Sequence, residues 1–334
     1  VANLSDMIAL GRIDMAMAGG MENFSDIPIR LSQNVRRSAM KLRQSRSTKD
    51  KLKVLGKLRL SDLALDIPAS EDFTTRKTMG ALTEAMVQKF HVSREDCDRF
   101  ALQSHQRATQ AIAAGNFKPD IAPVQINGHA AIDTDNSPRA GISMEKLAGL
   151  KPAFDKDEGV ITAGNASRFT DGAAALLLGS LGAAEKQGLE PMAVVKDYVF
   201  TGVDDLHTEM LLGPAMAIPR LLGKNKLSMD DIDVWEVHEA FAAQLLVNQV
   251  CLASDAFCKE RFGLKQALGA MPEDKLNIWG GSLALGNPFA ATGGRLLMTA
   301  ARRLQETGQR YAVVSSCAGG GLGTAILLEN PNLT

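Results

Sequence analysis

Residues 308–321 read Gly-Gln-Arg-Tyr-Ala-Val-Val-Ser-Ser-Cys-Ala-Gly-Gly-Gly, which is a glycine stop, a strand-like run and a glycine cluster. This stretch follows a helical pattern. Residues 11–20, Gly-Arg-Ile-Asp-Met-Ala-Met-Ala-Gly-Gly, repeat the same order after a helical stretch at the other end of the chain. Glycine ends helices readily because it adopts a left-handed backbone without steric cost. The repeat therefore predicts a duplicated α/β core.

Strand and helix patterns alternate through the second half of the chain. We expect strands at 159–164, 173–178, 192–201, 233–237, 275–279, 311–316 and 324–329. We expect helices at 93–114, 213–222, 238–252 and 294–306. The small and aliphatic run at 173–178 predicts a strand buried on both faces. This alternation favours an α/β fold with mixed, buried sheets.

The composition excludes several classes of protein. The chain has 334 residues, 45% of them hydrophobic, and its 37 Lys and Arg nearly balance its 38 Asp and Glu. These values are typical of a globular protein and exclude collagen-like and disordered chains. No apolar run reaches the roughly 18 residues that a membrane helix needs. The length predicts two domains or one large α/β unit.

Cysteine and histidine are sparse and scattered. The four cysteines form no Cys-x-x-Cys pair: Cys97, Cys251, Cys258 and Cys317. This spacing argues against a disulfide framework and for a reducing compartment. The five histidines form no cluster with cysteines or carboxylates at metal-ligand spacing, so we expect no metal site. We expect His105, on the helix at 93–114, to be structural or at the surface.

A strongly basic segment interrupts the first half. Residues 30–59 contain eleven Lys and Arg and a single acid, Asp50, so the rest of the chain is acidic. Such a run is commonly a solvated insertion. The alternatives are contact with an anionic membrane surface, with a partner subunit or with an anionic ligand such as a nucleotide phosphate. The segment has no aromatic residue for base stacking, so we expect no binding of nucleic acid.

Cys317 is the first candidate for chemistry. A cysteine at a strand end is often plain packing. Three glycines follow Ala318, however, and so glycine-rich a turn lets a ligand approach backbone N–H groups that can bind an oxyanion. We therefore favour a functional thiol at this position.

Two further segments are candidates. His238-Glu239 lies where a strand is expected to pass into a helix, and the imidazole could donate to an oxygen or orient a water. A lone histidine at a helix start is more often a cap or a satisfied core residue. Asn287 lies in a Gly-Asn-Pro turn, and its amide can donate to a carbonyl but cannot accept a proton as histidine would. The alternative for Asn287 is turn formation alone.

Together these segments resemble four motifs of the thiolase family. Residues 19–22 (Gly-Gly-Met-Glu) are similar to its GG-x-E strand end, and residues 164–173 to its GNAS-x-x-x-DGA signature. Residues 238–241 (His-Glu-Ala-Phe) match its (N/H)EAF motif, and residues 317–321 its C-x-GGG motif. The HEAF variant and the basic insertion are most similar to the fatty-acid-oxidation type.

The resemblance implies a duplicated, thiolase-like α/β core in αβαβα layers with an inserted loop domain. Residues 1–24 would then be the remainder of the N-terminal core and residues 25–150 the insertion. Residues 151–185 would end the N-terminal core, and residues 186–334 would form the C-terminal domain. The first N-terminal strands would be missing, because the repeat places the start of the first-half pattern upstream of Val1.

The resemblance also implies a chemistry. Thiolases cleave 3-ketoacyl-CoA with CoA, which is a substrate rather than a cofactor, or run the reverse condensation. A nucleophilic cysteine holds the acyl group as a thioester. Cys317 would be the acid/base thiol, and His238 with Glu239 beside it would lie at the thioester oxygen. The N–H of Gly319 would contribute to the oxyanion hole.

Two departures from the family pattern affect this expectation. The nucleophile is not in the present sequence and is expected upstream of Val1. Asn287 replaces the usual histidine of a Gly-His-Pro turn, and related ketoacyl synthases of the initiating type have an asparagine at a comparable position. We hypothesise slow thiolysis, or a shift toward decarboxylative or condensing chemistry.

Alternatives to a β-oxidation acyltransferase are a non-catalytic subunit that binds acyl-CoA or a partner, and a condensing enzyme. The C-x-GGG turn argues against the last, because such synthases typically have a histidine in place of the acid/base cysteine. The resemblance further implies a homodimer and a possible complex with a hydratase/dehydrogenase α-subunit. The compartment would be the cytoplasm in a bacterium or the mitochondrial matrix in a eukaryote, with possible peripheral membrane contact through residues 30–59.

Overall fold

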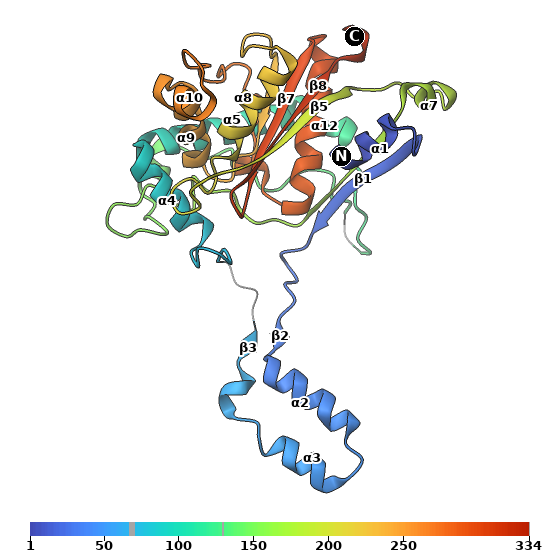
Figure 1. Ribbon diagram of the computed structural model, residues 1–334, viewed down its shortest axis with the longest axis vertical. Helices are drawn as coiled ribbons and strands as arrows, with labels where there is room; N and C mark the ends of the chain where they lie inside the picture. Colours follow the sequence, from blue (N-terminus) through green and yellow to red (C-terminus); the bar gives the residue numbers. More distant parts are fainter. Residues whose placement is uncertain (67–70, 129, 334) are drawn as a thin grey trace.

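The computed structural model describes residues 1–66, 71–128 and 130–333 (Figure 1). Its larger sheet is ordered β5–β8–β7–β6. The strands are β5 (Val194–Gly202), β6 (Val234–Val237), β7 (Tyr311–Ala318) and β8 (Leu322–Glu329). β8 is antiparallel to both neighbours, and β6 is parallel to β7. Alternate side chains of β7 enter two different hydrophobic clusters, so both faces of this sheet are covered.

The second sheet repeats the β7–β8 unit. β1 (Met15–Glu22) and β4 (Gly172–Gly179) pair antiparallel over their full lengths. α1 (Ala2–Ala9) precedes β1 as α12 (Phe289–Thr307) precedes β7. The glycines that stop these helices, Gly11 and Gly308, have φ of 66° and 64°. The chain order of the repeat is therefore also a structural order: helix, glycine, strand, antiparallel partner.

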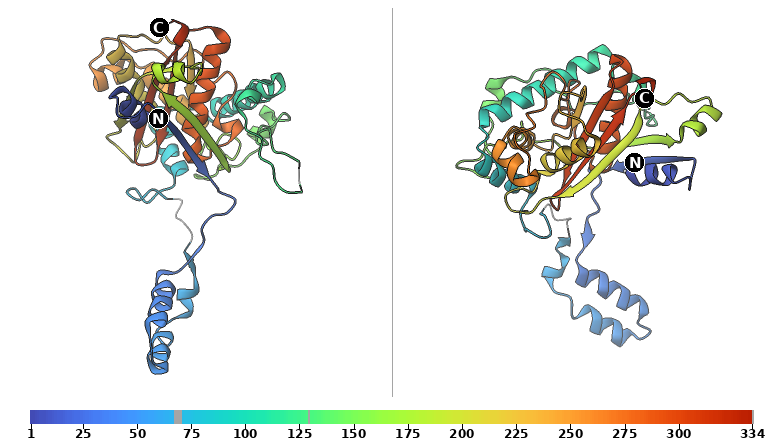
Figure 2. Two further views of the ribbon diagram at one scale, coloured as in Figure 1. Left: turned by 90° about the vertical axis from the view of Figure 1, so that its right-hand side faces the viewer. Right: turned by 45° about the horizontal axis from the view of Figure 1, so that its top comes forward.

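α12 lies between the two sheets (Figure 2) and contacts β1 and β4 on one side and β6 and β7 on the other. Glycines permit this close packing. A Cβ on Gly20 would lie 2.1 Å from the Ala290 carbonyl oxygen, and one on Gly294 would lie 2.9 Å from Ala174 Cβ. α8 (Gly213–Asn225) covers the opposite face of the four-stranded sheet. The result is the layered α/β architecture that the sequence indicates.

Further helices surround this core. They are α4 (Met79–Phe90), α5 (Arg94–Ala114), α6 (Met144–Ala148), α7 (Leu181–Lys186), α9 (Ala242–Leu252), α10 (Asp255–Phe262) and α11 (Ser282–Leu285). The described residues also form 3₁₀ turns at Leu60–Leu63, Lys118–Asp120 and Pro331–Leu333. α5 confirms the predicted helix, with Ser93 as its N-cap and Gly115 as its left-handed C-cap. None of the helices in the described part of the chain is long and apolar enough to cross a bilayer.

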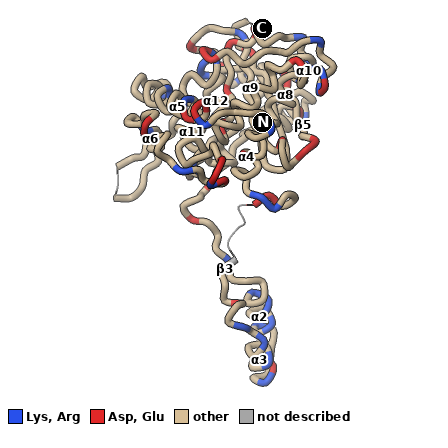
Figure 3. Tube along the Cα trace, turned by 90° about the vertical axis from the view of Figure 1, so that its left-hand side faces the viewer, with Lys and Arg blue, Asp and Glu red and all other residues tan. Residues whose placement is uncertain are grey.

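The two repeats differ in what joins their strands. Three glycines, 319–321, connect β7 to β8, whereas residues 23–171 lie between β1 and β4. The basic segment projects from this insertion as an arm (Figure 1). The arm is defined here as residues 30–66, and its elements are β2 (Arg30–Leu31), α2 (Gln33–Gln44), α3 (Thr48–Leu55), the first 3₁₀ turn and β3 (Leu65–Asp66). Neither helix contains a buried residue, and Lys and Arg line both (Figure 3).

Two predicted strands are wrong. At 159–164 the Glu84 carboxylate on α4 accepts hydrogen bonds from Val160 N and Ile161 N, at 3.1 and 3.0 Å. These backbone donors are therefore used by a side chain rather than by a neighbouring strand. At 275–279 a single bridge joins Leu276 to Trp235. Asn277 follows with φ of 44°, which ends extended backbone at once.

Three other expectations need correction. β4 is not buried on both faces: Leu177 is 58% exposed, and Met17, which pairs with it on β1, is 72% exposed. The two-stranded sheet packs against α12 with one face only, which explains this exposure. α12 begins at Phe289, five residues before the predicted start, because the Gly293-Gly294 pair is accommodated within the helix. His105 is 4% exposed and therefore not at the surface.

The close packing of α8 on β8 leaves no room for a methyl group at Gly213, so we expect its addition to lower stability. A Cβ on Gly213 would lie 2.5 Å from Gly323 Cα, whereas one on Gly223, in the same helix, would meet nothing within 4 Å. We expect Gly213→Ala to lower the free energy of unfolding by about 1–3 kcal/mol. Gly223→Ala should leave it unchanged or raise it, because alanine favours helix. Urea denaturation of both variants tests this, and equal midpoints would contradict the close packing.

Candidate active site

The HEAF segment, residues 238–241, leaves the carboxyl end of β6 as extended chain. His238 N donates to Ser315 O on β7 at 2.9 Å, which continues the pairing of the two strands. The helix predicted from residue 238 begins only at Ala242. Phe241 caps it without a side-chain hydrogen bond and forms a bridge with Ala166. The segment is thus held by two neighbours before α9 starts.

Residues 165–168, within the GNAS signature, lie between the HEAF segment and the Asn287 turn. Asn165 O accepts from Ala242 N, and Ser167 N donates to Ala240 O, both at 2.9 Å. One residue later Arg168 O accepts from Asn287 N at 2.9 Å. An irregular loop therefore joins the two candidate segments through its backbone. We call residues 165–168 the signature loop.

The Asn165 side chain fixes the signature loop from behind. Its Nδ2 donates to Asp98 Oδ1 at 2.8 Å and to Val160 O at 2.9 Å, and its Oδ1 accepts from Thr162 N. Asp98 lies on α5 and pairs with Arg94 at 2.7 Å. The sequence interpretation missed Asp98 and Glu84. A helical carboxylate looks like surface charge in a sequence, and only the packing of α4 and α5 onto this loop shows its role.

Glu239 points into the protein. Its Oε1 accepts from Asn277 Nδ2 at 2.7 Å, and its Oε2 accepts from Ser104 Oγ at 2.7 Å and Leu283 N at 3.1 Å. Burial raises the pKa of this carboxyl, while these hydrogen bonds oppose the rise. A Cβ on Gly281 would lie 2.2 Å from the carboxyl carbon. Glu239 thus ties the HEAF segment to α5 and to the start of α11.

Cys317 lies near the end of β7, two residues beyond Ser315, whose carbonyl binds His238 N. The thiol is 6% exposed and joins the hydrophobic cluster on the α8 and α9 side of the sheet. Burial raises its pKa to about 12, so the group is held as a thiol rather than a thiolate. Gly319 follows at the exposed hairpin tip, where a Cβ would lie 3.9 Å from Met79 Sδ on α4.

Asn287 is held by its side chain as well as by its backbone. Oδ1 accepts from Thr292 Oγ1 at 2.9 Å, and Nδ2 lies 3.4 Å from Ser167 Oγ. The residue is 6% exposed. Gly286 before it has φ of 95° and packs against Thr170, where a Cβ would come within 2.5 Å of Cγ2. Accepting from Thr292 directs the amide NH₂ toward the signature loop as a donor.

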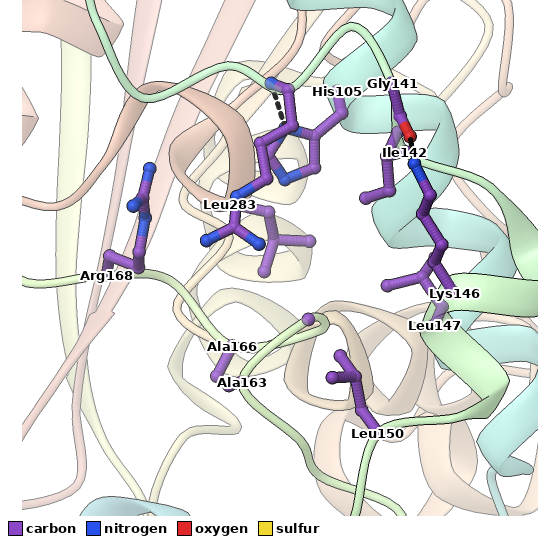
Figure 4. A pocket seen from close by; sticks show the side chains of 12 residues that line it. His105, Gly141, Ile142, Lys146, Leu147, Leu150, Ala163, Ala166, Arg168 and Leu283 are labelled. Carbon is purple, nitrogen blue, oxygen red and sulfur yellow. Dashed lines mark hydrogen bonds between the residues drawn. The ribbon is translucent and has the colours of Figure 1, made fainter.

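A cavity of about 360 Å³ adjoins the signature loop (Figure 4). Gly164 and Ala166 line one side of it, and the cations of Arg139, Lys146 and Arg168 line others. His105 is part of the wall, and its Nδ1 accepts from Arg139 N at 3.1 Å. Such a basic cavity suits a ligand with anionic groups.

The remaining cysteines are buried in helices. Cys97, Cys251 and Cys258 are buried in α5, α9 and α10. Burial raises the pKa of Cys97 and of Cys251 to about 12, so neither is a ready thiolate. Within residues 1–66, 71–128 and 130–333, no three His, Cys, Asp or Glu side chains gather as a metal site would require. A buried thiol, an imidazole and an amide on adjoining segments suit acyl transfer.

Comparison with known proteins identifies this arrangement. The family model for the thiolase N-terminal domain matches residues 1–181, and that for the thiolase C-terminal domain matches residues 189–330. The chain belongs to the thiolase family. It is 43% identical to the rat mitochondrial trifunctional enzyme subunit beta over 97% of this chain and 67% of that protein. It is 39% identical to a 3-ketoacyl-CoA thiolase of Pseudoalteromonas translucida over 99% of this chain and 76% of the relative.

Solved thiolase structures share the fold. A Bacillus anthracis acetyl-CoA acetyltransferase has a TM-score of 0.79 at 32% identity, covering 98% of this chain and 75% of its own. Human mitochondrial 3-ketoacyl-CoA thiolase in complex with CoA also has a TM-score of 0.79, at 30% identity, covering 98% of this chain and 74% of its own. The resemblance inferred from the four motifs and the thiolase-like α/β fold class are thereby confirmed.

Because His105 is buried, we expect the stability of this thiolase to depend on pH. Burial, reinforced by Arg139 and Arg168, lowers its pKa to about 4 from 6.5. Below pH 6.5 the His105 ring is protonated in the unfolded chain, but in the folded chain it stays neutral until the pH approaches 4. The free energy of unfolding therefore falls as the pH falls from 6.5 toward 4. From pH 7 to pH 5 the loss from this group is about 2 kcal/mol. His105→Gln should reduce the pH dependence by that amount in urea titrations, and an unchanged dependence would contradict it.

Proposed function

We propose that this protein is a thiolase of fatty-acid β-oxidation, an acetyl-CoA C-acyltransferase that cleaves 3-ketoacyl-CoA with CoA. The observation that carries the proposal is Cys317 on β7, one strand from the HEAF segment that the signature loop fixes against Asn287. The relatives named as 3-ketoacyl-CoA thiolases support the same reaction.

Cys317 gives up one proton in the cleavage step and takes one back in the transfer of the acyl group to CoA. A nucleophilic thiolate attacks C3 of the substrate, the C2–C3 bond breaks, and the electron pair remains on acetyl-CoA as an enolate. The Cys317 thiol, which burial keeps protonated, gives its proton to C2. The resulting thiolate then takes the proton of the incoming CoA thiol, which attacks the acyl thioester. The mechanism also requires an acyl-holding nucleophile in addition to Cys317.

The neutral donors of the site fit the oxygens of this reaction. Burial, with the nearby Arg295 cation, lowers the pKa of His238 to about 3, so the ring is neutral and can donate to a thioester or enolate oxygen. The Asn287 amide can donate in the same way. We assign the backbone N–H of Gly319, at the exposed hairpin tip, to the oxyanion hole over the nucleophile.

The cavity beside the signature loop is our candidate site for CoA. Its three cations suit the phosphates of the nucleotide end, and Gly164 and Ala166 let a thin pantetheine chain pass close to the backbone. The solved relative in complex with CoA supports a CoA site in this fold. CoA acts as a substrate here, and the proposed mechanism requires no further cofactor.

The first test is thiolysis by the full-length native protein. We expect acetyl-CoA and a shortened acyl-CoA from 3-ketoacyl-CoA and CoA, followed as loss of the substrate's absorbance. Cys317→Ala should lower kcat by roughly 10²–10⁴-fold, as expected for removal of a general acid/base. Cys258→Ala, which removes a buried thiol in α10, is the matched control and should retain kcat. No turnover by the wild type, with CoA still bound, would favour the non-catalytic subunit instead.

Asn287 supports a variant of this function. An amide donates a hydrogen bond but takes no proton, so it stabilises an enolate without helping a thiol to ionise. Thiolysis should therefore be slow, and decarboxylative or condensing chemistry relatively favoured. This is the second candidate function.

Restoring the family histidine tests the role of Asn287. We expect Asn287→His to raise the thiolysis rate of the full-length protein, because imidazole can assist ionisation of a thiol. Condensation measured in the same preparations serves as the comparison. A wild type that is already fast, with no gain in the variant, would refute the proposed effect.

We further propose that the arm contacts an anionic membrane surface. Its exposed apolar side chains include Met40, Leu52 and Leu60, and its charge is strongly positive. Each Lys or Arg near such a surface contributes about 1 kcal/mol to membrane binding.

A homodimer and an α-subunit partner are further parts of the proposal. Similarity to a subunit named as the beta subunit of a mitochondrial trifunctional enzyme supports the α-subunit partner. The bacterial relative supports a cytoplasmic location equally.

Vesicle sedimentation tests the arm. The protein should sediment with vesicles containing phosphatidylglycerol and less with pure phosphatidylcholine, and salt should weaken the binding. The triple variant Arg37→Glu, Lys41→Glu, Lys53→Glu should lose binding. Reversing three exposed lysines outside the arm, at positions 156, 186 and 265, should change it little. Equal losses in both triple variants would exclude a specific role of the arm.

A further inference from the structure

We propose that Ser282 and Arg295 are positioning residues that hold His238 as the tautomer with its proton on Nε2. This inference rests on the proposed function, because it specifies how His238 acts in that reaction. It makes the imidazole a hydrogen-bond donor toward the reacting oxygen and excludes it as a general base.

Two hydrogen bonds meet at one hydroxyl. His238 Nδ1 lies 2.8 Å from Ser282 Oγ, and Arg295 Nη2 donates to the same oxygen at 2.7 Å. Ser282 is fully buried and is the first residue of the four-residue helix α11. Arg295 lies on α12, six residues into the helix. The three side chains thus come from three different segments of the chain: the HEAF segment, α11 and α12.

The proton on the hydroxyl decides the tautomer. A guanidinium only donates, so Ser282 Oγ accepts from Arg295. Among the residues that the structure describes, the serine proton has one acceptor within reach, His238 Nδ1. If the imidazole carried its proton on Nδ1, the buried serine O–H would have no acceptor, which costs about 1–3 kcal/mol. Nδ1 is therefore the unprotonated nitrogen, and Nε2 carries the hydrogen.

Neighbouring groups keep this arrangement in place. Glu239 binds Leu283 N directly after Ser282, and His238 N is bound to Ser315 O. The backbone positions of both partners are thus fixed from independent sides. The arrangement resembles a catalytic triad in its logic, since a third group orients the second and the second orients the imidazole.

The charges around Arg295 favour a neutral ring. Glu236, Glu239 and Asp135 are the acidic groups that act on Arg295, and Glu236 is already paired with Arg303 at 2.6 Å. Burial of the imidazole and the Arg295 guanidinium both oppose formation of an imidazolium at His238. Because Nδ1 accepts from the Ser282 hydroxyl and a second ring proton is disfavoured, the ring can bind a ligand only by donating from Nε2–H.

The wild-type protein provides the first measurement. ¹⁵N NMR of the full-length protein labelled in histidine distinguishes protonated from unprotonated ring nitrogens, and His238→Gln assigns the signals. We expect one His238 tautomer at pH 7, protonated on Nε2 and unprotonated on Nδ1. A ring protonated on Nδ1, on both nitrogens, or an even mixture of tautomers would overturn the proposal.

Variants then connect the tautomer to catalysis. Ser282→Ala should yield mixed tautomers and lower kcat on the order of 10- to 100-fold, less than the roughly 10⁴-fold of a fully wrong tautomer, with little change in KM. Ser282→Thr, which keeps the hydroxyl, should restore a single tautomer and most of kcat. Arg295→Met should also mix the tautomers. Arg302→Met is its matched control, because Arg302 lies on the same helix but pairs with Asp120.

The outcomes separate the two proposals. A single Nε2–H tautomer in a protein without thiolase activity would refute the proposed function and leave the positioning intact. An active wild type with Nδ1 protonated would refute the positioning alone. A loss of kcat in Ser282→Ala while the tautomer stays pure would show a merely structural role and would also contradict it.

Discussion

Three backbone hydrogen bonds of the signature loop determine the geometry of the whole candidate site. Asn165 O accepts from Ala242 N just after the HEAF segment, Ser167 N donates to Ala240 O within it, and Arg168 O accepts from Asn287 N. The loop has no regular structure of its own, so its shape is imposed by the Asn165 side chain and by Asp98 on α5. If these bonds were absent, His238 would remain attached to β7, and Asn287 would lose the backbone bond to the loop that also binds the HEAF segment. The geometry of the candidate site therefore depends on the packing of α5 against this loop.

The site also contains more buried polar groups than a core normally tolerates. Burying a charge is costly unless it is paired or hydrogen-bonded. Glu239 meets this requirement with three donors, and Arg303 does so with Glu236 and the Trp235 carbonyl. The neutral His238 and the protonated Cys317 avoid the cost by carrying no charge at rest. A site of neutral donors and a thiol can stabilise an enolate oxygen while moving only one proton.

The sequence predicted the duplicated α/β core because glycines at 11 and 308 and the paired strands have local signatures. It also predicted the candidates Cys317, His238 and Asn287, through motifs that require particular side chains in short segments. The sequence-based predictions were wrong where contacts with residues far along the chain determine the local structure. The strand predicted at 159–164 is replaced by contacts with Glu84, and the outer face of β4 is uncovered because α12 packs on one side only. Ser282 and Arg295 gave no signal, since their role depends on three segments meeting. The assigned roles of the site residues, and the division into domains, remain predictions.

The most direct test of this account is native-state amide hydrogen exchange of the full-length protein, resolved to single residues. The amides of Ser167, Ala242 and Asn287 each donate across the signature loop, so they report the same interaction from three segments. We expect all three to exchange slowly and at similar rates, close to those of amides in β7, because opening one requires the loop to release the others. Fast exchange at Ser167 and Asn287, as in an exposed loop, would contradict the claim that this loop holds the site together.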